Sequence, residues 1–165
     1  MVAAVARVRG SLRCGFSTGT AATASARAAL RQLLAGRTAA CLAVRLPSGI
    51  FFPVSIGEAY LTGQGAVATV IKDGGDDPDV THGAVIRAKV RCWSSGAAEG
   101  SSTGGSNCLP GILLVAGEGV GVVTKPGLPI AIGEPAVNPV PRRMLAENLT
   151  EELLLWDAVE GISRG

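Results

Sequence analysis

The chain has 165 residues, of which 47% are hydrophobic and 17% charged, and its formal net charge is +2. This length suits one domain with a single hydrophobic core. The small net charge, and the absence of a Lys/Arg block interleaved with aromatic residues, argue against a nucleic-acid partner. Apolar runs such as 28–30 and 153–156 are too short to cross a bilayer, so we expect no membrane association. Arg7, Arg9 and Arg13 follow the first apolar residues, an order opposite to that of a secretory signal, and we therefore expect a cytoplasmic protein.

Cysteine spacing is informative. Cys14, Cys41, Cys92 and Cys108 are spread along the chain without a C-x-x-C pair. This spacing argues against a zinc site, and a cytoplasmic setting argues against structural disulfides. We therefore expect buried or chemically idle thiols and no metal site.

The clearest predicted helix covers residues 17–36. Ser17 or Thr18 can serve as its N-cap, the run 21–35 is dense in strong helix formers, and Gly36 supplies a stop. Arg27 and Arg31, four residues apart, are expected on a face of their own. The apolar face is predicted to comprise Ala26, Leu30, Leu33 and Leu34.

Alternating apolar residues predict a meander of strands. The first members are expected over 42–46, 51–56 and 66–71, and the sharpest pattern lies in 85–93. One face of that last strand carries Ile86, Ala88, Val90 and Cys92, and the other Arg87, Lys89 and Arg91. The Gly/Ser-rich segment 94–107 is predicted to be a flexible hairpin loop, after which 112–116 resumes the sheet.

The last part of the chain is proline-rich from 125 to 141 and ends in a helical pattern. Pro141 suits a first helical turn, and Glu151 and Glu152 are expected to open a second helical piece after Thr150. The pattern repeats every four residues, at Leu145, Leu149 and Leu153. The predicted class is α+β, with helices packed on one face of a mostly antiparallel sheet.

The first segment that points to chemistry is 15–20, directly before the first helix. Free backbone N–H groups and the hydroxyls of Ser17, Thr18 and Thr20 at a helix N-terminus would suit an anion, because the helix dipole favours negative charge there. The alternative is an ordinary helix cap preceded by a turn.

The second segment is the loop 72–83, which crowds four aspartates, Lys72 and His82 into twelve residues. Crowded carboxylates raise one another's pKa, which would suit a general acid or base. Asp76, Asp77 and Asp79 are therefore candidates for proton handling, with His82, the only histidine, as a further one. An EF-hand calcium loop is excluded, because this segment lacks the glycine and the glutamate that the EF-hand pattern requires. The alternative is a solvated turn in which Asp and Gly serve the backbone.

The third segment, 117–127, combines a Gly-x-Gly-x-Gly turn at Gly117, Gly119 and Gly121 with Lys125. Such a turn lets backbone amides approach a ligand closely, and Lys125 could meet a carboxylate or phosphate. The spacing is neither a Rossmann fingerprint nor a P-loop. A further candidate is the basic stripe of the predicted strand 85–93, which would suit a substrate with several carboxylates or else be a solvated outer face.

These segments together resemble the cobalt-precorrin-5B C1-methyltransferase family, enzymes of the oxygen-independent route to cobalamin. The matching stretches are GFSTGTAA at 15–22, VIKDGGDDPDVTHGA at 70–84 and GEGVGVVTKPGLPIAIGEPAVNPVPRRM at 117–144, in the family's order. Such a composite signature is far more specific than one Gly-rich loop. Cys14 stands where the family has Thr, and Ala21 where it has Cys, so no role of that cysteine is carried over.

The resemblance implies an N-terminal α+β domain over 1–160 that precedes a second α/β domain outside this chain. It implies S-adenosylmethionine-dependent methylation of C1 of a cobalt-containing corrin intermediate, cobalt-precorrin-5B, to give cobalt-precorrin-6A, with loss of acetaldehyde. The donor is expected to bind mainly in the second domain. The oligomeric state is left open, with a homo-oligomer as one possibility.

If the chain binds such a corrin substrate, the chemistry of individual residues suggests their roles in the site. Four basic residues, Lys72, Lys125, Arg142 and Arg143, suit the carboxylates of the substrate. Two other classes of function remain open. One is a kinase-like enzyme that holds a nucleotide phosphate on the helix start 17–20 and the segment 117–121, and the other is a non-catalytic binding or assembly domain.

Overall fold

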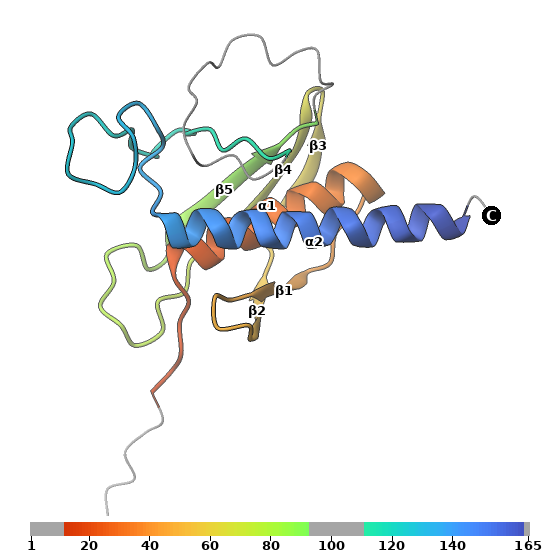
Figure 1. The fold of residues 1–165 in the computed structure, drawn as a ribbon. Coiled ribbons are helices and arrows are strands. Elements are labelled where there is room, and N and C mark those ends of the chain that lie inside the picture. The colour runs from red at the N-terminus through yellow and green to blue at the C-terminus, as the bar shows by residue number, and fades with distance from the viewer. Residues whose placement is uncertain (1–11, 93–110, 164–165) are drawn as a thin grey trace, which may run out of the picture.

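The computed structural model describes residues 12–92 and 111–163. These described residues form two helices and five strands, and the strands pair antiparallel in two sheets (Figure 1), which confirms the α+β class. In chain order the elements are α1 (Thr18–Ala35), β1 (Cys41–Arg45), β2 (Phe51–Ser55), β3 (Ala59–Thr62), β4 (Gly65–Ile71), β5 (Val85–Val90) and α2 (Pro139–Ser163). The predicted loop 94–107 and Cys108 lie outside the described residues. Within the described part, neither helix has the length and apolar character needed to cross a membrane.

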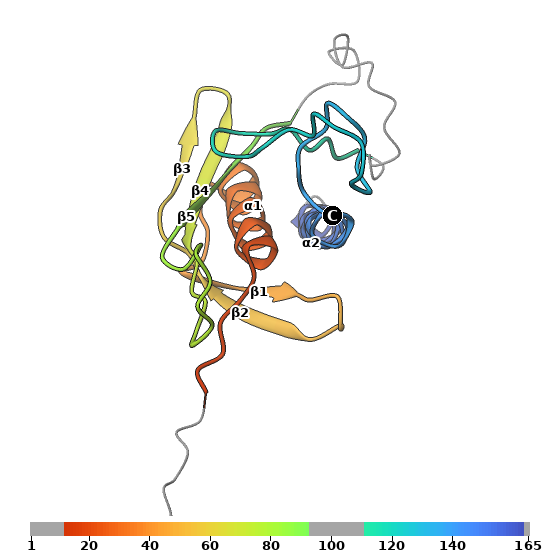
Figure 2. The same cartoon turned by 90° about the vertical axis from the view of Figure 1, so that its left-hand side faces the viewer.

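The elements form layers. β1 and β2 make a two-stranded sheet, and β4 lies at the centre of a three-stranded sheet with β3 and β5 on either side. Figure 2 shows α1 between the three-stranded sheet and α2, so both helices lie on the same side of that sheet, as predicted. β4 is therefore covered by α1, and Ala66, Ala68 and Val70 are fully buried.

α1 begins and ends where the sequence predicts. The hydroxyl of Ser17 accepts a hydrogen bond from the Thr20 amide at 3.1 Å, and Gly36 caps the other end with φ 68°. The prediction that Arg27 lies on a separate basic face was wrong, because α1 is enclosed by the sheet and α2. The Arg27 side chain is 7% exposed, its Nε lies 2.6 Å from the Glu152 carboxylate, and Arg31 pairs with the same carboxylate.

α2 is one continuous helix of 25 residues, so the predicted break after Thr150 was wrong. Leu145 and Leu149 are buried against Ala26 and Leu30 of α1, which confirms the apolar stripe. α2 runs parallel to α1, and the first turns of the two helices meet at one end of the molecule (Figure 1). Their contact is close, since a Cβ on Gly19 would lie 3.0 Å from Cγ of Pro141.

The observed strands agree with those predicted from alternating apolar residues, except at two places. β3 was missed, because its burial does not alternate and Tyr60 and Leu61 are both exposed. The predicted strand 112–116 was also wrong: in the described part it pairs as no strand, although Ile112 and Leu114 pack beside the α1–α2 contact. On β5, Arg87 and Lys89 lie on the exposed face, as predicted.

Cys14, Cys41 and Cys92 are free and exposed. The expectation of buried thiols is therefore wrong for these three residues.

Candidate functional site

The first two sequence segments pair through their backbones. Cys14 and Gly75 form an antiparallel bridge, and the Phe16 amide donates to the Asp73 carbonyl at 2.8 Å. A Cβ on Gly15 would lie 2.1 Å from the backbone carbon of Gly74, so only glycine permits this approach. Gly75 has φ 64°, a conformation that favours glycine. These glycines therefore serve to join the two segments.

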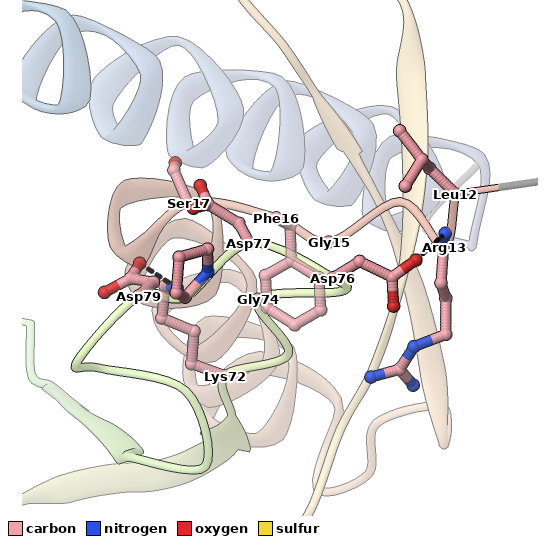
Figure 3. Close-up of a pocket in the computed structure, with 11 residues that line it drawn as sticks. Leu12, Arg13, Gly15, Phe16, Ser17, Lys72, Gly74, Asp76, Asp77 and Asp79 are labelled. Atoms are coloured by element: carbon pink, nitrogen blue, oxygen red, sulfur yellow. Dashed lines mark hydrogen bonds and ion pairs between the residues drawn. The ribbon is translucent and has the colours of Figure 1, made fainter.

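A cavity of about 610 Å³ opens where the segments meet, beside the N-terminus of α1 (Figure 3). One wall is formed by Gly15, Phe16 and Ser17, which lead into α1. The other wall comes from the loop between β4 and β5. It contributes Lys72, Gly74, Asp76, Asp77, Pro78 and Asp79, and Leu12 and Arg13 complete the lining.

Lys72 and Asp79 form the shortest ion pair of this site (Figure 3). Lys72 Nζ lies 2.5 Å from Asp79 Oδ2, and the lysine side chain is only 1% exposed. The other oxygen of Asp79 accepts hydrogen bonds from the Thr81 amide at 2.8 Å and the Thr81 hydroxyl at 2.7 Å. The Lys72 hydrogen bond, helped by Thr81, holds the pKa of Asp79 well below its usual value. The expectation of a raised pKa was therefore wrong for Asp79.

Lys72 consequently has little freedom to bind a substrate carboxylate. Its ammonium is buried and already compensated by Asp79, so a ligand would have to displace that carboxylate. The pair instead closes the loop 72–79 onto the end of β4.

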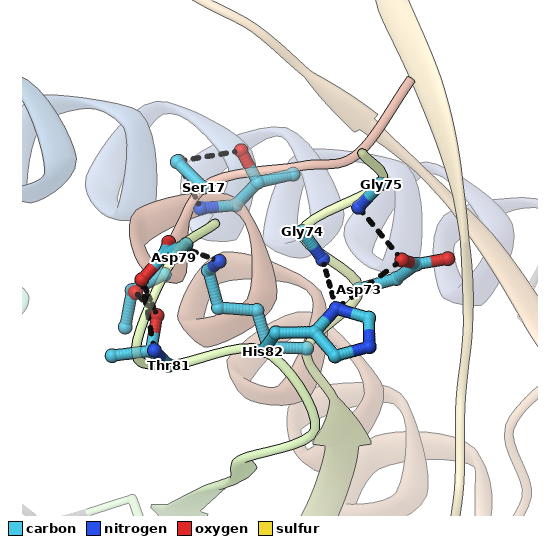
Figure 4. A network of polar contacts seen from close by, with 10 residues as sticks. Ser17, Asp73, Gly74, Gly75, Asp79, Thr81 and His82 are labelled. Carbon is cyan, nitrogen blue, oxygen red and sulfur yellow. Dashed lines mark hydrogen bonds and ion pairs between the residues drawn. The ribbon is translucent and has the colours of Figure 1, made fainter. Parts of the chain in front are cut away.

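Asp73 and His82 order the rest of the loop (Figure 4). Asp73 Oδ1 accepts hydrogen bonds from Arg13 Nη2 at 2.9 Å and from the Gly75 amide at 2.8 Å. His82 Nδ1 accepts one from the Gly74 amide at 3.0 Å. Because Nδ1 accepts this bond, the half-exposed imidazole can donate a hydrogen bond through Nε2.

Asp76 and Asp77 differ in their partners. Asp76 Oδ2 accepts from the Arg13 amide at 2.6 Å, so its carboxylate fastens the incoming chain (Figure 3). The exposed side chain of Asp77 makes no hydrogen bond or ion pair with the residues that the structure describes. Among the cavity's three aspartates, Asp77 is thus the one whose carboxylate is available to a ligand.

The hydroxyls at the start of α1 also divide into two kinds. Ser17 and Thr20 serve the helix cap, with their hydroxyl oxygens 3.0 Å apart, and Thr20 is buried. Thr18 is exposed, and its hydroxyl lies 3.3 Å from that of Thr81 across the loop. Of the three hydroxyls, that of Thr18 takes no part in the cap, but Thr18 does not line the cavity.

The third sequence segment lies at the same end of the molecule but on the other side of the helices (Figures 1 and 2). None of its residues lines the cavity. Gly117, Gly119 and Lys125 are exposed there, and Gly119 has φ 79°. The turn at 117–121 therefore has the glycine backbone conformation that the sequence predicted. It lies away from the Asp-rich loop 72–83.

Arg142 and Arg143 are adjacent in sequence but lie in different surroundings. Arg142 is 9% exposed and holds the loop before α2 through hydrogen bonds to the carbonyls of Val137 and Pro135 and to the Glu134 carboxylate. The guanidinium therefore positions the loop. Arg143 is 62% exposed and 3.8 Å from Glu147, so it remains accessible.

A sequence model for the family described as CbiD matches residues 5–160. The chain belongs to the CbiD family. It is 46% identical over 138 residues to the cobalt-precorrin-5B C(1)-methyltransferase of Pseudomonas putida (strain GB-1), covering 84% of this chain and 34% of that protein. It is 43% identical to the protein of the same name from Geobacillus kaustophilus, covering 92% of this chain and 37% of that protein.

A crystal structure of the cobalamin biosynthesis protein cbiD from Archaeoglobus fulgidus has the same fold. Its TM-score with this chain is 0.62 at 26% sequence identity, and the match covers 88% of this chain and 40% of that one. The chain thus spans about a third of the length of the curated CbiD relatives that it matches.

Sequence reasoning missed part of this candidate site. Arg13 lines the cavity and holds both Asp73 and Asp76, yet it precedes the Gly-rich segment and stands in no motif pattern. The available signal was the glycines of both segments, since Gly15 and the Gly74–Gly75 pair permit two backbones to approach closely.

Proposed function

We propose that this chain is the substrate-binding part of an S-adenosylmethionine-dependent methyltransferase that converts cobalt-precorrin-5B into cobalt-precorrin-6A by methylation of C1. Family membership supports this function, because the curated relatives carry that enzyme name. The observation that carries the proposal is the pairing of the first two segments around one cavity. Their backbone contacts turn two separate loops into one preformed site.

Substrate carboxylates are the first group that the site has to hold. The N-termini of α1 and α2 lie together, and neither helix has an acidic residue in its first turn, so their dipoles favour a negative ligand. Lys125 and Arg143 are exposed cations near these two N-termini, outside the cavity that Arg13 helps to line. We assign carboxylate binding to these two residues, with Thr18 as a hydrogen-bond donor. Lys72 and Arg142 keep the surrounding loops in place.

Proton handling is the second requirement. We assign it to Asp77, which is the accessible carboxylate of the cavity, with His82 as a donor through Nε2. Asp79 is a poor base because Lys72 and Thr81 stabilise its ionised form. Asp76 is engaged by the Arg13 amide and acts on the position of the loop.

S-adenosylmethionine would supply the methyl group as an electrophilic sulfonium. The cavity beside α1 does not fit its adenosine part, because the cavity's apolar residues Leu12 and Pro78 are exposed and form no enclosed slot. We therefore place the donor site in the remainder of the CbiD-family protein, and this chain's contribution is to bind and orient the corrin.

Calorimetry tests this division of labour. The 165-residue chain is titrated with S-adenosylmethionine and, separately, with a cobalt-corrin intermediate. We expect corrinoid binding without donor binding and without turnover. Tight donor binding with no corrinoid binding would reverse the assignment. Thermal stabilisation by a nucleotide but not by a corrinoid would favour the kinase-like alternative.

A further inference from the structure

A second cavity lies at the end of α1 that is farther from the first one. It has a volume of about 380 Å³ and is lined by the end of α1, the segment after it and one face of α2. α1 has 18 residues, so its two ends are about 27 Å apart at 1.5 Å of rise per residue. The two cavities have no lining residue in common. The second cavity is therefore a separate feature of the surface.

The acidic group of this cavity is already paired twice. Glu152 is the acidic residue of the lining, and its carboxylate accepts hydrogen bonds from Arg27 and Arg31 of α1. Arg31 also lines the cavity, and its side chain is 34% exposed. It donates to Glu152 through Nε, and its two Nη groups make no hydrogen bond with the residues that the structure describes. These Nη groups are therefore free to bind a ligand.

Arg37 adds a further positive charge to the lining. Its side chain is exposed and makes no hydrogen bond or ion pair within the described part of the chain. Three guanidinium groups in or next to the lining, those of Arg27, Arg31 and Arg37, are thus balanced by one carboxylate. The carbonyl end of α1 opposes an anion with only about half a negative charge. The excess of positive charge is larger, so the cavity favours an anionic ligand.

The rest of the lining suits a flat apolar group. Leu34, Ala35 and Ala39 contribute to it together with the half-buried indole of Trp156. Thr38 also lines the cavity, and its buried Oγ1 has no hydrogen-bond partner among the described residues. An unpaired buried hydroxyl is costly, so a bound group that pairs with Thr38 would remove that cost.

We propose that the second cavity binds an oxyanion, a carboxylate or a phosphate, that is carried by a flat apolar group. Arg31 and Arg37 hold the oxyanion, because guanidinium groups match the geometry of both anions. The flat group lies against Trp156, and the Thr38 hydroxyl donates to the oxyanion. This site goes beyond the proposed methyl transfer and does not rest on it.

Tryptophan fluorescence tests the proposal on the 165-residue chain. A Trp93→Phe variant leaves Trp156 as the single tryptophan, so its emission reports on the second cavity. The probes are benzoate and inorganic phosphate, and benzamide is the uncharged control for benzoate. We expect a saturable change with benzoate and a weaker response to phosphate, which has no flat group. Benzamide should bind at least about tenfold more weakly than benzoate.

Variants in the same background show where the anion binds. Arg37→Gln should weaken benzoate binding about tenfold. Arg87→Gln is the matched control, since it removes the same charge from the exposed face of β5, outside the cavity, and should leave binding unchanged. Thr38→Val should weaken binding but leave the melting temperature nearly unchanged, because the hydroxyl has no partner in the free chain.

Absence of a saturable response to benzoate would overturn the proposal. Equal effects of Arg37→Gln and Arg87→Gln would overturn it as well, because binding would then follow the net charge of the chain. Once benzoate binding is established, calorimetry with a cobalt-corrin intermediate at saturating benzoate identifies the source of the oxyanion. Competition would mean that a carboxylate of the corrin occupies the site. Independent binding would mean that the site takes a separate small ligand, and both results support the site.

Discussion

Lys72 Nζ lies 2.5 Å from Asp79 Oδ2, and this contact joins a fully buried cation to a partly exposed carboxylate. The lysine leaves the end of β4, and the carboxylate lies seven residues later in the loop. The pair therefore fixes the loop that forms one wall of the cavity. Its stability depends on the ionisation of Asp79, because Lys72 would otherwise be a buried charge without compensation.

Acid should weaken this pair in a defined range of pH. The folded state holds the pKa of Asp79 below its usual value of 3.8. The unfolded chain therefore takes up the proton first, and the stabilisation is present above about pH 4 and lost progressively below it. Asp79→Asn should reduce the free energy of unfolding at pH 7, and its difference from wild type should narrow below pH 4. Urea unfolding at a series of pH values measures this.

Two further variants separate the pair from a general charge effect. Asp77→Asn removes a neighbouring carboxylate that has no partner among the described residues, so its effect on unfolding should be small. The double variant Lys72→Met/Asp79→Asn should be more stable than Asp79→Asn alone, because it removes the uncompensated ammonium. A double variant no more stable than the single one would contradict this account.

The buried carboxylate of Glu152 should be far more important for folding than that of its neighbour. Glu152 is 8% exposed and lies between Arg27 and Arg31, so Glu152→Gln should cost about 3 kcal/mol. Glu151 pairs with Arg45 on a more exposed part of the helix, and Glu151→Gln should cost less than about 1 kcal/mol. Denaturant unfolding of the two variants compares them directly. Similar losses would mean that burial does not set the strength of these pairs.

Periodicity predicted the elements whose burial is regular. α1, β4 and β5 were expected close to their observed bounds, because caps and one-sided burial leave a local pattern. β3 was not predicted, because the burial of Tyr60 and Leu61 does not alternate. The continuity of α2 was not predicted either, because Glu152 bonds to residues of α1 that are more than a hundred positions away in the sequence.

The site was predicted as residue types more than as contacts. The Gly-rich and Asp-rich segments were both singled out, but Lys72 and Arg142 looked available and are held inside the protein. Composition cannot distinguish a free cation from one that groups a few residues away in the chain have already paired.

Gly15 should be intolerant of any side chain. A Cβ there would overlap the backbone of Gly74 at 2.1 Å, so Gly15→Ala must push the two paired segments apart. We expect a loss of about 2 kcal/mol or more in the free energy of unfolding, with weaker corrinoid binding. Gly63→Ala is the control, since its Cβ would meet nothing within 4 Å, and its effect should stay within about 0.5 kcal/mol. Calorimetry and urea unfolding of both variants would show whether this close approach is required.

Asp77 is the residue on which the proposed chemistry depends most directly. Its carboxylate faces the cavity region without a partner among the described residues, so Asp77→Asn removes a proton acceptor and leaves the fold in place. In a full-length CbiD-family protein that contains this chain, turnover should fall about 10²-fold or more, which is the usual contribution of a general base. Glu58→Gln, a change of the same charge at an exposed position away from the cavity, should leave turnover unaltered. Unchanged turnover in Asp77→Asn, with normal corrinoid binding, would remove Asp77 from the reaction and leave His82 as the titratable group to examine.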